Sequence, residues 1–207
     1  GPKNRQAAII PNEHPLLGEG FNFTGLFLGD DGTWIKSRDG LFHLQDQGNL
    51  DIYTEKEGLA TNDVRALKED REGNLWIGTN GAGIQKFTGR AFSTFTTEDG
   101  MAGNIVMDVL KDPQGNTWFS TYDSGLSMRT PEGRWRDYWD AGGQSKLRNS
   151  RIWCSILSSD GTVYFGSSGG LFKNPDDPEY WTTEEGLPHN QVLALEEHQG
   201  RLYIGTA

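Results

Sequence analysis

The sequence predicts an all-β fold built from about five repeats, each with four short strands. Aromatic residues recur at a nearly constant interval, because Trp34, Trp76, Trp118, Tyr164 and Tyr203 are separated by 42, 42, 46 and 39 residues. Each stands in a short apolar strand that follows a polar turn rich in Gly and Asp. Apolar side chains alternate with period two, which is typical of strands. Four strands in a repeat of this length predict the blades of a β-propeller.

The second repeat shows the parts in order. A first strand, "VRALKE" from Val64, leads into the turn "DREGN" and the second strand "LWIGT". A glycine-rich break precedes the third strand in "AGIQKF", and the aromatic fourth strand ends in the acidic turn "FTTEDG". Gly, Asp and Asn suit such turns because they tolerate positive φ. No pattern indicates a helix. The repeats span approximately residues 21–57, 58–99, 100–146, 147–185 and 186–207.

The last repeat stops after its second strand, at "YIGTA". The segment "QAAIIPNEHPL" near the start aligns with "AFSTFTTEDGM", which places Ile10 at the position of Phe95. We therefore expect residues 6–20 to complete the last blade, so that residues 1–207 form one domain whose ring is closed by both chain ends. Closure would also protect strand edges from aggregation. The alternatives are a fragment of a larger propeller, or a larger ring shared by two chains.

The stretch from Gly58 to Asp99 contains the string "GL-x-x-N-x-V … D-x-x-G-N-L-W-I-G-T-x-x-x-G". This string resembles the two-component regulator propeller repeat, and the resemblance covers about residues 21–207. It implies a β-propeller sensor region of a bacterial signalling protein, in the periplasm or outside the cell. The sequence departs from the pattern at Ser150, beside the insertion "DAGGQSK", and at Lys36, which replaces a Gly. "SSDGTVY" also resembles the Asp-box hairpin of sialidase-like propellers, which is a folding element.

Composition excludes several classes of function. The net charge of −10 disfavours nucleic acid and anionic membrane surfaces as partners. No apolar run is long enough for a membrane-inserted helix. The single Cys154 and four scattered His residues show no metal-ligand spacing, and no cofactor-binding or nucleophile motif is present. We therefore expect no metal, no cofactor and no catalytic residue.

The repeats serve as controls for one another, because a residue common to all copies is explained by folding. Departures gather in the loop between the second and third strands, and in the residues that lead into the first strand. These two regions lie at the same end of an up-and-down blade, where they would ring one mouth of the central channel. The predicted ligand-binding residues are Arg38, Asn80, Tyr122, Asp123, Arg151, Trp153, His189 and Gln191.

The richest departure is the stretch 134–153, "RWRDYWDAGGQSKLRNSRIW", which holds five basic residues and two acidic ones. Trp139 and Trp153 are aromatic where other copies are not. Flat rings stack on sugar faces and Arg binds carboxylates in bidentate fashion, so the stretch would suit an acidic oligosaccharide. The alternative is a longer, solvated loop between blades.

The predicted function is a non-catalytic sensor module that binds a small molecule or an oligosaccharide and signals to a protein partner or a downstream domain. Two alternatives remain. The chain is a scaffold for protein–protein interaction, or it is a carbohydrate-active enzyme, a glycosidase or a lyase. A glycosidase would require two carboxylates about 5–10 Å apart in a cleft.

Overall fold

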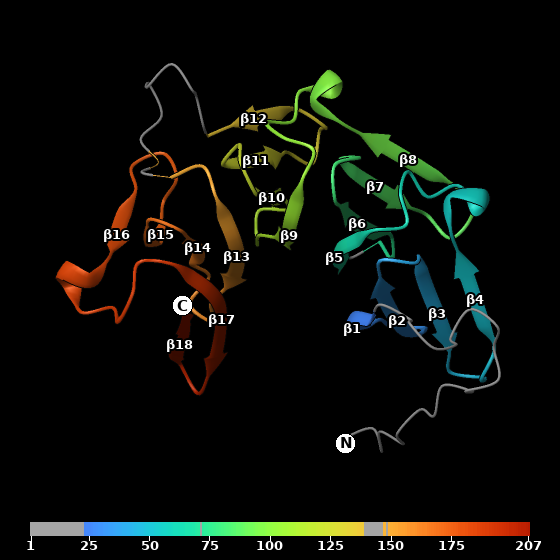
Figure 1. Ribbon diagram of the computed structural model, residues 1–207, viewed down its shortest axis with the longest axis horizontal. Helices are drawn as coiled ribbons and strands as arrows, with labels where there is room; N and C mark the ends of the chain where they lie inside the picture. Colours follow the sequence, from blue (N-terminus) through green and yellow to red (C-terminus); the bar gives the residue numbers. More distant parts are fainter. Residues whose placement is uncertain (1–22, 71, 139–146, 148) are drawn as a thin grey trace.

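The computed structural model describes residues 23–70, 72–138, 147 and 149–207. The described strands form five antiparallel sheets that follow one another along an arc (Figure 1). Four sheets have four strands and the last has two. We call them blades 1 to 5 in chain order. Consecutive strands are neighbours in every blade, so each blade is a meander, and the prediction of an all-β fold is confirmed.

The first strand of each blade lies on the concave side of the arc, and the fourth strand of each complete blade lies on the convex side (Figure 1). Blade 1 consists of β1 (Phe23–Leu28), β2 (Gly32–Ser37), β3 (Leu41–Gln45) and β4 (Leu50–Tyr53), and blade 2 of β5 (Val64–Glu69), β6 (Leu75–Thr79), β7 (Ile84–Phe87) and β8 (Phe92–Phe95). Blade 3 consists of β9 (Val106–Lys111), β10 (Thr117–Thr121), β11 (Leu126–Arg129) and β12 (Trp135–Asp137). Blade 4 consists of β13 (Ile152–Leu157), β14 (Val163–Ser167), β15 (Gly170–Lys173) and β16 (Glu179–Trp181), and blade 5 of β17 (Val192–His198) and β18 (Arg201–Thr206).

The turn between the first and second strands explains the repeated Asp, Asn and Trp. Asp70 accepts hydrogen bonds from the backbone N–H of Asn74 at 2.8 Å and from Trp76 Nε1 at 3.1 Å. In blade 3, Trp118 Nε1 donates to the equivalent Asp112 at 2.8 Å. One carboxylate thus closes the turn and orients the indole, because it accepts from several donors at once. The predicted scaffold role of these residues is confirmed.

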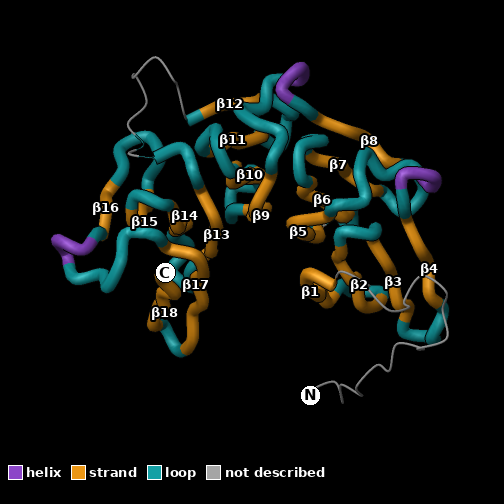
Figure 2. Tube along the Cα trace, in the orientation of Figure 1, coloured by secondary structure: helices purple, strands orange, loops and turns teal. Residues whose placement is uncertain are grey.

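Three single-turn 3-10 helices lie at the outer ends of blades, which corrects the expectation of no helix (Figure 2). They are η2 (Glu55–Glu57), η3 (Thr97–Asp99) and η4 (Thr183–Glu185). Each helix begins with a capping box. In η2, the side chain of the N-cap residue Thr54 accepts a hydrogen bond from the backbone N–H of Glu57, and the Glu57 carboxylate accepts one from the backbone N–H of Thr54. The helix ends at Gly58, whose φ of 108° suits glycine. A single helical turn is too short to produce a periodic pattern of apolar residues, so the sequence pattern gave no indication of these helices.

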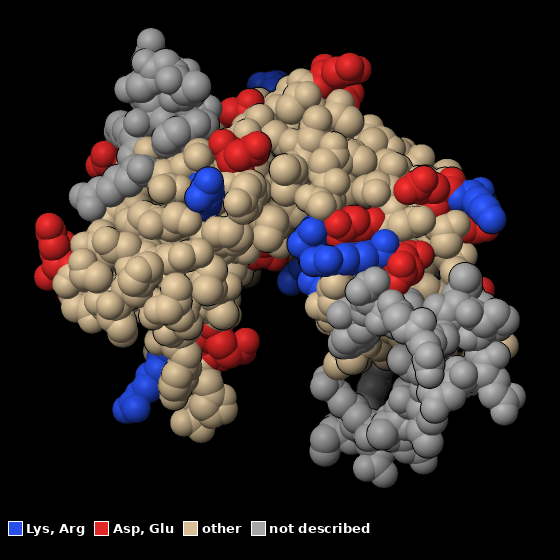
Figure 3. Space-filling view, viewed as in Figure 1, with Lys and Arg blue, Asp and Glu red and all other residues tan. Residues whose placement is uncertain are grey.

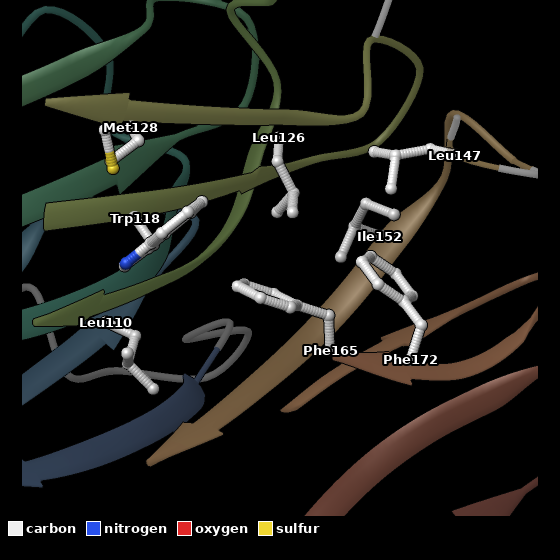
Figure 4. Packing of buried hydrophobic residues seen from close by; sticks show 8 residues of the cluster. All are labelled: Leu110, Trp118, Leu126, Met128, Leu147, Ile152, Phe165 and Phe172. Atoms are coloured by element: carbon white, nitrogen blue, oxygen red, sulfur yellow. The ribbon is translucent and has the colours of Figure 1, made fainter. Parts of the chain in front are cut away.

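Aromatic and aliphatic side chains pack between consecutive blades. Trp118 of blade 3 faces Phe165 of blade 4 with ring centroids 5.4 Å apart, and Leu126 and Ile152 complete the contact (Figure 4). The equivalent Trp34, Trp76 and Trp118 are only 5%, 3% and 8% exposed. Burying such a ring contributes on the order of 2–3 kcal/mol, so these contacts between blades hold the arc together.

The arc is open between blades 5 and 1 in the described part of the chain (Figure 1). Tyr203 of blade 5, at the position of the buried tryptophans, is 54% exposed. At the other end of the arc, Leu26 and Leu28 of β1 are each 56% exposed. The predicted pairing of residues 6–20 with the last blade lies outside the described residues. No helix among the described residues has the length and apolar character needed to cross a membrane.

Candidate functional site

The loops after the second strands meet the starts of the first strands at one end of the blades, as predicted. The backbone N–H of Asn80 donates to Asp63 at 3.1 Å, that of Tyr122 to Ile105 at 3.0 Å, and that of Ser168 to Arg151 at 3.1 Å. Neighbouring blades are also joined here, because the Gly125 N–H donates to Ser150. We call this end the loop face. The loops between second and third strands contribute residues 38–40, 80–83, 122–125 and 168–169. The segments that lead into first strands contribute residues 62–63, 104–105, 149–151 and 189–191.

Every first strand carries a β-bulge where it leaves the loop face. The pairing register shifts by one residue in all five blades, between Val64 and Ala66 in blade 2 and between Ile152 and Cys154 in blade 4. A bulge leaves one residue without a cross-strand partner and redirects its side chain. The bulge residues are Thr24, Arg65, Met107, Trp153 and Leu193. No residue type recurs among these five positions.

Tyr122, Arg151 and Trp153 form one cluster across the junction of blades 3 and 4. The rings of Tyr122 and Trp153 pack edge to face with centroids 5.4 Å apart. The guanidinium of Arg151 lies 5.1 Å from the centroid of Tyr122. Trp153 Nε1 donates to Ser168 Oγ at 2.9 Å, which orients the indole. Three of the eight predicted ligand-binding residues are therefore brought together.

The charge of Arg151 is available at this cluster. Its side chain is exposed, and no carboxylate among the described residues lies within ion-pair distance of it. The cation–π contact with Tyr122 restrains the guanidinium without using its N–H donors. The cluster therefore presents a cation, a tyrosine and a tryptophan to solvent in a protein of net charge −10. Such a group of side chains suits an anion that carries a flat or apolar face.

Asn80 belongs to a different group on the loop face. Its Nδ2 donates to Asp63 Oδ2 at 2.8 Å, and Asp63 also pairs with Arg65 at 3.0 Å. Figure 3 shows acidic and basic side chains side by side on the concave side where blades 1 and 2 meet. Because these charges neutralise one another, the group has less capacity for a charged ligand than Arg151 has.

The other four predicted residues make no contact with the cluster among the recorded interactions. Arg38 is exposed in the loop of blade 1, and Asp123 accepts a hydrogen bond from Ser124 Oγ at 3.0 Å. His189 Nδ1 accepts the backbone N–H of Gln191 at 3.0 Å, which gives this imidazole a local role in the turn. Gln191 is half-buried beside it. Their part in ligand binding stays a prediction.

Asp108, on the concave wall, is not among the residues predicted from the sequence. Asp108 Oδ2 accepts from Ser155 of blade 4 at 2.6 Å from the backbone N–H and at 2.7 Å from Oγ. Burial raises the pKa of Asp108, although the hydrogen bonds from Ser155 oppose the shift. The signal was present, because the equivalent residues in blades 2, 4 and 5 are the small Ala66, Cys154 and Ala194.

Lys36, the departure seen in the sequence, lies on the same wall. Its Nζ donates to the carbonyl of Arg65 in blade 2 at 2.6 Å. Burial lowers the pKa of Lys36, while the charge of Asp108 acts in the opposite direction. Lys36 and Asp108 thus each reach into the next blade, which gives them a structural role. Burial also raises the pKa of the neighbouring Cys154 to about 12, so its thiol is protonated at neutral pH.

The basic stretch 134–153 is divided by the fold. Arg136 pairs with Asp176 of blade 4 and lies 4.7 Å from the ring centroid of Tyr138 on the convex side. Arg151 lies instead on the loop face. Trp139, Lys146 and Arg148 fall outside the described residues. Arg136 and Arg151 thus lie apart, and the part of the stretch in binding an acidic oligosaccharide stays a prediction.

Blade 1 has a hollow of its own away from the loop face. A polar hollow of about 370 Å³ lies at the opposite end of blade 1 from the loop face, lined by Asp31, His43, Gln45, Asp46 and Gln47. His43 stacks on Trp34 with centroids 4.0 Å apart and contacts Asp31 at 3.2 Å, so its ring supports the turn. Within the described ranges, no group of three or more His, Cys, Asp or Glu side chains could hold a metal ion.

Residues 58–81 and 100–123 match the family described as two component regulator propeller. These two segments are two-component regulator propeller repeats. Each matched repeat starts at the glycine that ends a 3-10 helix and runs to the loop face, so it includes the Asp–Trp turn and the bulge. The resemblance seen in the sequence is thus confirmed for blades 2 and 3. No curated protein sequence matches the chain.

Solved structures share the fold at low sequence identity. The extracellular domains of BT3049 and BT4673 from B. thetaiotaomicron, described as hybrid two component systems, superpose with TM-scores of 0.78 and 0.75, both at 18% identity. Matches cover 90% and 89% of this chain but only 27% and 26% of those domains. Virginiamycin B lyase from Staphylococcus aureus superposes with a TM-score of 0.71 at 16% identity, covering 88% of this chain and 62% of the lyase. The fold therefore occurs both in extracellular domains of two-component systems and in an enzyme.

Proposed function

We propose that this chain is a non-catalytic ligand-binding module of a bacterial sensor, positioned in the periplasm or outside the cell. The two-component regulator propeller repeats and the extracellular sensor domains of the same fold support this proposal. Ligand binding would shift the blades slightly relative to one another and so alter their contacts with neighbouring domains. The signal would pass in this way to a partner protein or to a signalling domain of the same polypeptide.

The ligand site is the cluster of Tyr122, Arg151 and Trp153. The observation that carries this assignment is the exposed guanidinium of Arg151, held against Tyr122 with no carboxylate partner among the described residues. Removing an anion from water is favourable only where a fixed cation replaces its hydration. Trp153 beside it offers a flat face for a sugar ring. We therefore propose an acidic oligosaccharide as the ligand.

A thermal-shift and calorimetric experiment tests this function with oligogalacturonate as the acidic probe and cello-oligosaccharides as the neutral one. A ligand at 100 times its Kd adds about 2.7 kcal/mol to the free energy of unfolding. For a domain of this size the melting temperature should rise by roughly 5–10 °C with the acidic probe only. Arg151→Gln should remove the shift. Arg90→Gln is the matched control, because Arg90 is exposed in the turn between β7 and β8, at the other end of its blade.

Three outcomes would contradict the proposal. Equal binding of neutral and acidic probes would remove the role of Arg151, and so would an unchanged affinity in Arg151→Gln. Absence of any shift in a folded monomer would favour the interaction scaffold. The fold shared with virginiamycin B lyase supplies the second candidate, an enzyme. Chromatography of the acidic probe after incubation with the protein tests this second candidate, because shortened or unsaturated products would demonstrate catalysis.

A further inference from the structure

The bulge residues on both sides of Trp153 are apolar and accessible to solvent. Met107 of blade 3 is half-buried, and Leu193 of blade 5 is 43% exposed. Both occupy the extra position that the register shift creates in their strand, as Trp153 does in blade 4. The first strands β9, β13 and β17 pack in succession along the concave wall. Met107, Trp153 and Leu193 therefore follow one another at one level of that wall.

The bulge side chains of blades 2 and 4 turn towards the loop face. In blade 4, the bulge residue Trp153 reaches Ser168 in the loop of its own blade. In blade 2, the bulge residue Arg65 pairs with Asp63, which in turn binds Asn80 of the loop. The same backbone irregularity recurs in blades 3 and 5, so Met107 and Leu193 are directed in the same way. Blade 2 is ionic at this level, whereas blades 3, 4 and 5 are apolar.

The bulge position is buried in none of the five blades, so packing between blades does not account for Leu193. The buried residue before it, Val192, packs against blade 4 at the position of Val64, Val106 and Ile152. Leu193 itself is exposed on β17, the strand that packs against β13, which carries Trp153. Exposed apolar residues that adjoin an unpaired cation are typical of a binding surface.

We infer that the site extends along the bulge residues Met107, Trp153 and Leu193, and that its ligand is an acidic sugar with an apolar ring substituent. The inference rests on the proposed function of Arg151. The carboxylate binds Arg151, the sugar ring lies on Trp153, and the substituent covers Leu193 and Met107. Charge complementarity selects an anionic occupant, because Arg151 is the cation that adjoins the apolar wall and has no carboxylate partner among the described residues.

Three probes separate the parts of this ligand in calorimetric titrations of the full chain. They are 4-nitrophenyl β-D-glucuronide, methyl β-D-glucuronide, which lacks the aromatic ring, and 4-nitrophenyl β-D-glucoside, which lacks the carboxylate. Burial of the ring should make the Kd of the aryl glucuronide about tenfold lower than that of the methyl glucuronide. Release of 4-nitrophenolate, followed by absorbance, would reveal hydrolysis in the same samples.

Leu193→Ser and Met107→Ser should each reduce the advantage of the aryl probe to about threefold or less, with the Kd of the methyl glucuronide unchanged. Leu28→Ser is the matched control, because Leu28 is a more exposed leucine at the far end of β1 from the loop face. Arg151→Gln should weaken both glucuronides and leave the aryl glucoside unaffected. This pattern separates the apolar wall from the cation.

Equal affinity for the aryl and methyl glucuronides overturns the inference and leaves the proposed function standing. Persistence of the aryl advantage in both serine variants also overturns it. If the aryl glucoside binds as tightly as the aryl glucuronide, the proposed role of Arg151 fails while the apolar wall stands. If oligogalacturonate binds but none of the three probes does, the extended site is wrong and the acidic-sugar site remains.

Discussion

The turn at Asp70 and the cluster at Arg151 use charged residues in opposite ways. The Asp70 carboxylate is buried and accepts from Glu72, Asn74 and Trp76. Arg151 is exposed and contacts only the face of an aromatic ring among the recorded interactions of its guanidinium. The first arrangement recurs in blade 3, and the second does not recur in the described blades. Asp70 fills its hydrogen-bonding capacity inside its own blade, whereas the N–H donors of the Arg151 guanidinium have no carboxylate partner among the described residues.

The sharpest test of this contrast compares two tryptophans. Trp118→Ala removes a side chain that is 8% exposed between blades, and should lower the free energy of unfolding by about 3–5 kcal/mol. Trp153→Ala removes a half-exposed ring from the loop face and should cost about 1 kcal/mol or less. Urea unfolding followed by circular dichroism measures both. A larger loss for Trp153 would show that the cluster is part of the scaffold.

Two glycines of one loop extend the comparison to the backbone. An alanine Cβ at Gly83 would lie 2.2 Å from the carbonyl oxygen of Phe95, where the backbone φ is +76°. The Gly83→Ala variant should therefore lose about 3 kcal/mol or more of stability. Gly81 has a φ of +100° but no atom within 4 Å of such a Cβ, so Gly81→Ala should lose only about 1 kcal/mol. Similar melting temperatures for the two variants would contradict the steric explanation.

The charge at Asp70 gives a smaller effect that depends on pH. Burial alone would raise the pKa of Asp70, but hydrogen bonds from Asn74 and Trp76 and the charge of Lys86 lower it overall. The folded state therefore binds the proton less tightly than the unfolded state, and the stabilisation is present at neutral pH. This stabilisation is lost as pH falls through the lowered pKa of the folded state.

Asp70→Asn should accordingly be about 1–2 kcal/mol less stable than the wild type at pH 7. The difference should shrink towards pH 3, as measured by urea unfolding across that range. Asp123→Asn on the exposed loop face is the control and should change little at either pH. A difference for Asp70→Asn that grows on acidification would show that the sign of its pKa shift is wrong.

The sequence was most informative where one physical requirement recurs. Trp76 and Trp118 could be assigned to the scaffold because both need a neighbouring blade and an Asp acceptor, and the same letters therefore return at the same spacing. The Thr and acidic residues of the capping boxes also recur in the sequence. They predict only a turn, because a single helical turn leaves no periodic pattern.

The candidate site could be predicted only as a region. Comparing repeats placed Tyr122, Arg151 and Trp153 at one end of their blades, but it placed Arg38 and His189 there equally. It also joined Arg136 to Arg151 in one basic stretch, which the fold divides between the convex side and the loop face. Asp108 is uncommon as a strand residue, but its small equivalents Ala66 and Cys154 align with it securely only once the strand register is known.

The sequence by itself determined the repeat, the order of strands and the residues that close each turn, because those depend on contacts within one blade or on one contact repeated between blades. The tertiary structure alone decided which variable residues meet. Trp153 joins Tyr122 because a bulge redirects one side chain while the packing of blades 3 and 4 sets the distance to the other. The bulge depends on how two strands pair, and the distance depends on how two blades pack. No single residue of the sequence determines either, so the site could be located only in the folded structure.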